Sequence, residues 1–141
     1  MVLVIGLNPA IDRILIVPNF VVGATLKAES VQTLAAGKAM NVAAVLRLLG
    51  VRVGYAGFVG KEEAVFFRKR LPDVECWMVE VYGRTRTDTT VIDPVHHTET
   101  HFREPGFAVQ SEDLRKFRDA LMEILGGVEL VVMSGSLPPG A

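Results

Sequence analysis

The chain has 141 residues, half of them hydrophobic, and a formal net charge of −1 from 15 basic and 16 acidic side chains. This length fits one domain with a hydrophobic core, and the balanced charge argues against a nucleic-acid partner. No apolar stretch reaches the length of a transmembrane helix, and the first residues do not match a signal peptide. The single cysteine, Cys76, cannot form an internal disulfide, which favours a reducing, cytoplasmic compartment.

Apolar runs alternate with helical patterns along the chain, which is typical of an α/β fold. Residues 2–7 form a continuous apolar run, which predicts a strand buried on both faces of a parallel sheet. Residues 11–17 predict a second strand, and the more polar residues 29–34 predict a strand with one exposed face. Residues 40–49 predict a helix. Its expected apolar face comprises Met40, Val42, Val45, Leu46 and Leu49, with Gly50 just beyond its C-terminal end.

The middle of the chain continues this alternation. Residues 53–58 predict a strand, residues 61–71 a helix that the following proline ends, and residues 74–81 another strand. Two threonine-rich runs, residues 87–93 and 98–103, flank a turn sequence. They predict a hairpin of partly exposed strands.

The last quarter contains one helix and one strand. Ser111 is predicted to cap the helix, with Glu112 and Asp113 in the first turn favouring the helix dipole. Residues 129–133 predict a buried strand, which runs into a serine- and proline-rich turn. In an α/β fold a helix should follow and cover the sheet, so we expect an unfinished domain.

Two segments stand where an α/β sheet binds ligands, beyond the carboxyl ends of its strands. Asp12 follows the first strand and has a carboxylate that could accept hydrogen bonds from vicinal hydroxyls; the alternative is an ordinary turn aspartate beside Arg13. Residues 36–41 begin a helix, where free N–H groups suit anions and polar oxygens. Lys38 adds charge there, and Asn41 offers both a donor and an acceptor. The alternative for this segment is ordinary helix capping.

Four other motifs contain residue types that can carry chemistry. Arg86 lies in an arginine-rich segment that could hold a phosphate, although a solvated charge cluster is the alternative. Residues 134–140 form a serine-rich turn without the pattern of a nucleophile elbow, which favours binding over acyl chemistry. The glycines at 54, 57 and 60 do not match a dinucleotide fingerprint, and tight turns would explain them. The three histidines in the hairpin do not converge, so we expect no metal site.

Four segments, taken in order, resemble the signatures of one family. They read Leu-Asn-Pro-Ala-Ile-Asp at 7–12, Ala-Ala-Gly-Lys-Ala-Met-Asn-Val-Ala at 35–43, Glu-Pro-Gly at 104–106 and Ser-Gly-Ser-Leu-Pro-Pro-Gly at 134–140. The chain therefore resembles the N-terminal half of the ribokinase/PfkB superfamily of sugar kinases, nearest to its branch of 1-phosphofructokinase and tagatose-6-phosphate kinase. The resemblance spans essentially the whole chain.

The resemblance implies a ribokinase-like open, mostly parallel sheet with helices on both faces, incomplete here, plus a small β-sheet lid. Residues 1–141 would be the N-terminal part of that domain. The lid strands would be approximately residues 11–18, 29–35, 87–93 and 98–103. Such a lid covers the sugar site and often forms a dimer contact.

The same resemblance assigns site residues. Asp12 would bind sugar hydroxyls, Gly37 and Asn41 would complete that contact, and Lys38 lies in the same segment. Lys27, Arg86 and Ser136 would lie near the substrate's phosphate. The sequence departs from the family where Ala36 and Ala39 replace the usual glycines and where Arg103 replaces the asparagine before Glu-Pro-Gly.

The family reaction transfers a phosphoryl group from ATP, with Mg²⁺, to a ketohexose phosphate such as fructose 1-phosphate, fructose 6-phosphate or tagatose 6-phosphate. The family's catalytic aspartate, ATP pocket and Mg²⁺-linked motif would lie beyond residue 141, so we expect no catalytic residue and no activity in this chain alone. Its partners would be a sugar phosphate and either a second copy or the C-terminal half. Alternatives are a non-catalytic sugar-phosphate-binding or dimerisation module, the product of a split or truncated gene and, less favoured, a dinucleotide-binding domain.

Overall fold

The computed structural model describes residues 1–141, which form two four-stranded sheets and three α-helices. The first sheet is parallel throughout and has the strand order β5-β4-β1-β8. Its strands are β1 (Val2–Gly6), β4 (Val53–Gly60), β5 (Glu75–Val81) and β8 (Leu130–Met133). This parallel sheet with helices confirms the predicted α/β class.

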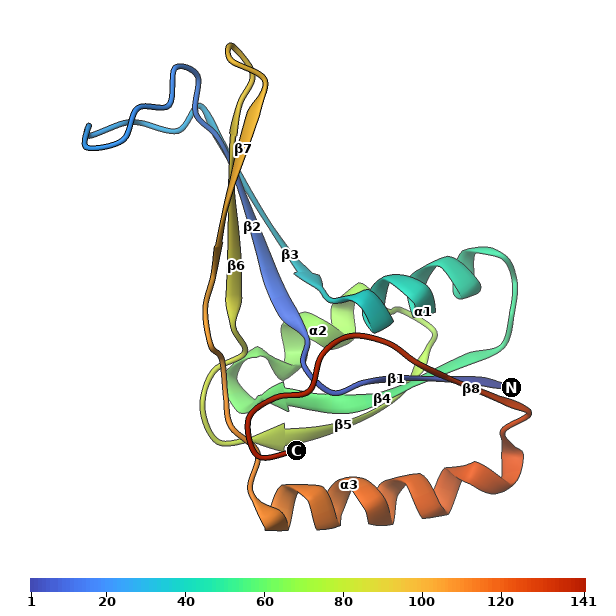
Figure 1. Cartoon of the computed structure of the whole chain (residues 1–141). Helices are drawn as coiled ribbons and strands as arrows, with labels where there is room; N and C mark the ends of the chain where they lie inside the picture. The colour runs from blue at the N-terminus through green and yellow to red at the C-terminus, as the bar shows by residue number, and fades with distance from the viewer.

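Helices cover both faces of the first sheet, which explains why its central strands are continuously apolar. Val4 packs on the face covered by α1 (Lys38–Leu48) and α2 (Ala64–Arg70), and α2 follows a single 3₁₀ turn, η1 (Lys61–Glu63). Leu3 and Ile5 point to the opposite face and pack near Phe117 of α3 (Ser111–Ile124). Figure 1 shows α1 and α2 on one side of the sheet and α3 on the other. None of the helices combines the length and apolar character needed to cross a membrane.

The second sheet has the strand order β3-β2-β6-β7 and mixes parallel and antiparallel pairs. It rises from the carboxyl end of the first sheet and stands upright over it in Figure 1. The central pair, β2 and β6, is parallel, and the two outer pairs are antiparallel. Its strands are β2 (Ala10–Ile16), β3 (Ser30–Ala36), β6 (Thr87–Asp93) and β7 (Thr98–Arg103).

A buried carboxylate joins the hairpin of β6 and β7 to the loop after β2. Asp93 is 2% exposed and accepts hydrogen bonds from the backbone N–H groups of Asn19, Phe20 and Val95 at 2.8–3.1 Å. The ring Nδ1 of His96 lies 2.7 Å from Asp93 Oδ2, the oxygen that also accepts the Phe20 N–H. Burial raises the pKa of Asp93, but these donors outweigh it and hold the pKa well below its usual range. His96 therefore has a structural role, because its contact with Asp93 helps hold the β6–β7 turn against the loop after β2.

Helix α1 buries only part of the face that its large apolar residues predicted: Met40 is buried, and Val42 and Leu46 pack against the core. The buried residues are Ala39, Met40, Ala43 and Ala44, whereas Val45 is 54% and Leu49 72% exposed. The small alanines allow α1 to approach β1 closely, since a Cβ added to Gly6 would lie only 2.6 Å from the Cβ of Ala39. Close backbone contact, rather than side-chain size, selects this face.

Three local predictions were wrong. The strand that was expected to be buried at residues 129–133 is β8, which is exposed because it lies at the edge of the first sheet; Leu130 is 56% and Met133 68% exposed. Ser111 is the first residue of α3 rather than its cap; Gln110 is the N-cap, and its N–H donates to the Asp113 carboxylate at 2.9 Å. Gly54 and Gly57 lie inside β4, not in tight turns, whereas Gly60 ends β4 and is the N-cap of η1. They leave room for close neighbours, because a Cβ at Gly54 would lie 2.7 Å from the Trp77 ring.

Candidate functional site

A polar cavity lies between the carboxyl edge of the first sheet and the base of the second sheet. Its volume is about 300 Å³, and only one of its 11 lining residues is hydrophobic. We call it the polar pocket. It is lined by Asn8, Ala10, Asp12, Gly37, Lys38, Asn41, Arg86, Asp88, Arg103, Gly135 and Ser136.

Asp12 reaches the polar pocket from β2 of the second sheet. Its carboxylate is partly buried and has Asp88 opposite it on β6. Burial, followed by the negative charge of Asp88, raises the pKa of Asp12, and Arg86 partly opposes this shift. Asp12 thus offers an acceptor in a place where water solvates it poorly, so a ligand hydroxyl would gain a strong hydrogen bond there.

The start of α1 forms the second wall of the pocket. Gly37 precedes the helix with a φ of 125°, a conformation that residues with a side chain rarely adopt, and a Cβ there would lie 3.3 Å from the Cα of Pro9. This turn directs the helix N-terminus toward the pocket, where Lys38 and Asn41 contribute to its lining. Free N–H groups and the Lys38 ammonium favour an oxygen-rich or anionic ligand.

Arg86 forms the third wall and is held firmly. Its side chain is 19% exposed, its Nε donates to the Pro9 carbonyl oxygen at 3.3 Å, and its Nη1 lies 3.6 Å from Asp88 Oδ2. The Glu-Pro-Gly turn packs against it, since a Cβ at Gly106 would lie 2.9 Å from the Arg86 Cβ. A guanidinium positioned in this way is suited to bind a phosphate without reorganising.

The turn after β8 closes the pocket from the remaining side. The Asn8 side-chain amide donates to Ser136 Oγ at 3.1 Å and to the Leu137 carbonyl oxygen at 3.3 Å. These bonds connect the turn after β1 to the turn after β8, two neighbouring strands of the first sheet. Asn8 is thus a pocket residue to which the sequence analysis assigned no role.

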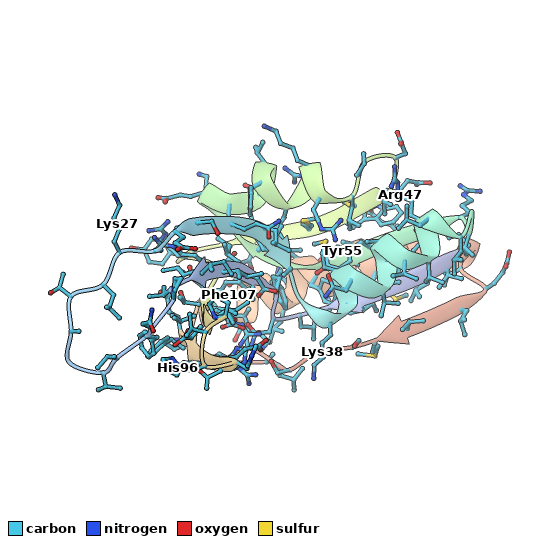
Figure 2. All side chains as sticks on the ribbon, turned by 90° about the horizontal axis from the view of Figure 1, so that it is seen from above. Lys27, Lys38, Arg47, Tyr55, His96 and Phe107 are labelled. Carbon is cyan, nitrogen blue, oxygen red and sulfur yellow. The ribbon has the colours of Figure 1, made fainter.

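Six of the seven residues that the resemblance assigned to the substrate line the polar pocket. The seventh, Lys27, lies in the loop between β2 and β3. Figure 2 shows Lys27 at one end of the molecule and Lys38 at the start of α1, far from it. Their binding roles stay predictions. The six pocket residues are Asp12, Gly37, Lys38, Asn41, Arg86 and Ser136.

The charges of the pocket suit a ligand that has both hydroxyls and an anionic group. Three cations, Lys38, Arg86 and Arg103, face two carboxylates, Asp12 and Asp88. No group of three or more His, Cys, Asp or Glu side chains is arranged to hold a metal ion. A larger hollow of about 530 Å³ lies near Lys61 and Tyr82, and it contains none of the predicted site residues.

A polar pocket at the carboxyl edge of an open parallel sheet, beneath a small second sheet, is the arrangement of a ribokinase-like carbohydrate kinase. The family model of pfkB family carbohydrate kinases matches residues 1–141, and the chain therefore belongs to that family. It is 32% identical over 141 residues to 1-phosphofructokinase of Rhodobacter capsulatus and 33% identical over 138 residues to that of Escherichia coli K12. Each alignment covers 96% of this chain and 44% of the relative.

Solved structures agree with this fold. A possible 1-phosphofructokinase from Thermotoga maritima superposes with a TM-score of 0.88 at 34% identity, covering 100% of this chain and 46% of that one. Phosphofructokinase-2 from Escherichia coli in complex with fructose-6-phosphate shares the fold, with a TM-score of 0.84 at 24% identity and 46% of its length covered. The chain thus spans about half the length of the relatives it matches.

Proposed function

We propose that residues 1–141 provide the substrate-binding part of a sugar-phosphate kinase whose substrate is a ketohexose phosphate. The observation that carries this proposal is the convergence of Asp12, the Gly37–Asn41 helix start and Arg86 on one polar pocket. The similarity to 1-phosphofructokinases supports a phosphorylated ketohexose as the ligand. Fructose 6-phosphate stays a candidate because phosphofructokinase-2, which shares the fold, was solved in complex with it.

Each wall of the pocket has a proposed role. Asp12 accepts hydrogen bonds from sugar hydroxyls, and Gly37 and Asn41 hold the same part of the sugar through backbone and amide groups. Arg86 binds the phosphate, and Ser136 donates to it from the turn after β8. Lys27 lies outside the lining of the polar pocket. It is proposed to contact the phosphate only when the loop between β2 and β3 approaches the polar pocket.

ATP supplies the transferred phosphoryl group in this family, with Mg²⁺ as its counter-ion. Because the relatives are about twice as long as this chain, we expect the ATP- and Mg²⁺-binding residues in the half that the chain does not match. The second sheet is the proposed contact for a homodimer, and its Val31 and Phe102 are each 53% exposed. A cytoplasmic location stays a prediction.

A second candidate for residues 1–141 is a sugar-phosphate-binding module without catalysis of its own, which the polar pocket alone would support. A purified protein of residues 1–141 is expected to bind ketohexose phosphates without sugar-dependent ATP hydrolysis or phosphorylation, because phosphoryl transfer requires groups that position ATP. A coupled assay for ADP measures this. Turnover above the background without sugar would contradict it, and turnover restored by a separate C-terminal half would favour a two-chain kinase.

Phosphate selectivity tests the proposed ligand directly. Isothermal titration should show fructose 1-phosphate or fructose 6-phosphate binding at least about 10-fold more tightly than fructose, since a hydrogen-bonded charge pair contributes about 1.5–3 kcal/mol. Arg86→Gln should remove most of this advantage. Arg52→Gln is the matched control, because Arg52 is 78% exposed and lies outside the pocket. Equal affinities for fructose and its phosphates in the parent protein would contradict the proposal.

A further inference from the structure

Three charged residues lie side by side across the second sheet. In the β-ladder Asp12 of β2 is opposite Asp88 of β6, and Asp88 is opposite Arg103 of β7. All three line the polar pocket. They also line an adjoining cavity of about 230 Å³, together with Thr90 and His101. Directly opposed residues on one face of a sheet are close enough to share a ligand.

Asp88 has an unsatisfied oxygen in this row. Its side chain is 21% exposed, and Oδ2 lies 3.6 Å from Arg86 Nη1. Its other oxygen, Oδ1, is buried and has no hydrogen-bond partner in the protein. Buried carboxylate oxygens nearly always have a donor, so this atom requires one from outside the chain.

The neighbouring side chains do not supply that donor. Arg103 is exposed and takes part in none of the ion pairs of the chain, although it is the residue opposite Asp88. Arg86 is directed to the Pro9 carbonyl oxygen and to the other oxygen of Asp88. Asp12, on the opposite side, is a carboxylate whose pKa is raised by burial and by the charge of Asp88. The buried Oδ1 of Asp88 and the neighbouring Asp12 carboxylate are therefore suited to accept hydrogen bonds from ligand hydroxyls.

We propose that Asp88 is a specificity-determining residue, whose Oδ1 accepts a hydrogen bond from a sugar hydroxyl adjacent to the hydroxyl that Asp12 holds. This inference rests on the proposed function and adds the class of sugar. The pocket selects phosphorylated ketohexoses with free hydroxyls on two neighbouring carbons. A hydroxyl donates to each carboxylate, which also reduces the repulsion between Asp12 and Asp88. Arg103 remains free to contact the anionic end of the ligand.

The test compares fructose 6-phosphate with its 3-deoxy and 4-deoxy analogues by isothermal titration. The parent protein is expected to bind each analogue about 10-fold or more weakly than fructose 6-phosphate, because each lacks one charge-assisted hydrogen bond. In Asp88→Ala, one of these two differences should fall below about twofold while the other persists. In Asp12→Ala the pattern should be reversed. Deoxy differences in Asp88→Ala that equal those of the parent would overturn the inference.

Controls separate this inference from the proposed function. If the parent protein binds no ketohexose phosphate, the proposed function fails and the assignment of Asp88 fails with it. If the parent protein binds fructose 6-phosphate and only the Asp88→Ala pattern is absent, the proposed function stands and the assignment alone is wrong. Asp88→Ala should also retain the preference for phosphate over fructose, which shows that Arg86 has kept its position. Asp73→Asn, an exposed aspartate outside the pocket, should leave every affinity unchanged.

Discussion

An Asp12→Asn variant is expected to bind ketohexose phosphates about 100-fold more weakly than the parent protein, without any loss of fold stability. A charge-assisted hydrogen bond from a sugar hydroxyl to the Asp12 carboxylate would contribute about 1.5–3 kcal/mol, and the amide replaces one acceptor oxygen with a donor. Titration calorimetry measures the affinity, and thermal unfolding measures the stability. Asp73→Asn makes the same chemical change at an exposed site and should alter neither quantity.

The stability part of this prediction follows from the pKa of Asp12. Burial and then Asp88 raise it above the value in the unfolded chain, so the ionised carboxylate opposes folding at neutral pH. This opposition disappears as the pH falls through the raised pKa, and the variant lacks it at every pH. The variant should therefore unfold at the same temperature as the parent protein or at a higher one. A large loss of stability would instead make Asp12 a structural residue.

The affinity for sugar should change with pH in the direction opposite to the contribution of Asp12 to folding stability. The proposed hydrogen bonds require the ionised form of Asp12, so affinity should fall as the pH is lowered, and the fall should begin at a higher pH than for an unperturbed aspartate. A carboxylate that is needed for binding and that opposes folding is typical of functional sites.

A Gly57→Ala variant is expected to lose about 3 kcal/mol of unfolding free energy, the largest stability effect that we predict for one methyl group. Gly57 of β4 is opposite Gly6 of β1. An added Cβ would overlap the Gly6 carbonyl oxygen and lie 3.0 Å from its carbonyl carbon. Both strands are in the centre of the first sheet, so neither can move without separating the hydrogen-bonded ladder.

Chemical denaturation of matched variants tests this stability prediction. Gly126→Ala adds the same methyl group where no atom lies within 4 Å, and it should leave the midpoint nearly unchanged. Equal midpoints for Gly57→Ala and the parent protein would show that β1 and β4 can separate enough to admit a side chain. Gly6 precedes the turn that carries the pocket residue Asn8, so displacement of β1 should also weaken sugar binding.

The pattern of apolar and polar residues predicted most of the fold. Continuous apolar runs indicate strands buried on both faces, and alternating threonine-rich runs indicate partly exposed strands. The eight strands and three helices lie within a few residues of their predicted positions. The buried face of α1 was predicted only in part, because alanines at a close helix–strand contact are buried in place of larger residues such as Val45.

The polar pocket was predicted only in part. Asp12, the Gly37–Asn41 segment and Arg86 lie in recognisable motifs, whereas Asp88 and Arg103 are in ordinary threonine-rich strands. Their place in the pocket depends on the register between β2 and β6, which are far apart in the sequence. Asp88 and Arg103 could have been identified from their pairing in the predicted hairpin. They lie on adjacent strands and on the same face as Asp12, the predicted sugar-binding aspartate.

Binding of a phosphorylated ketohexose at the polar pocket can be located by an NMR titration of the ¹⁵N-labelled protein with fructose 1-phosphate. Saturable amide shifts are expected at Asp12, at residues 37–41, at residues 86–88 and around Ser136. Shifts gathered around Lys61 and Tyr82 instead, or none at millimolar sugar phosphate, would contradict binding at the polar pocket.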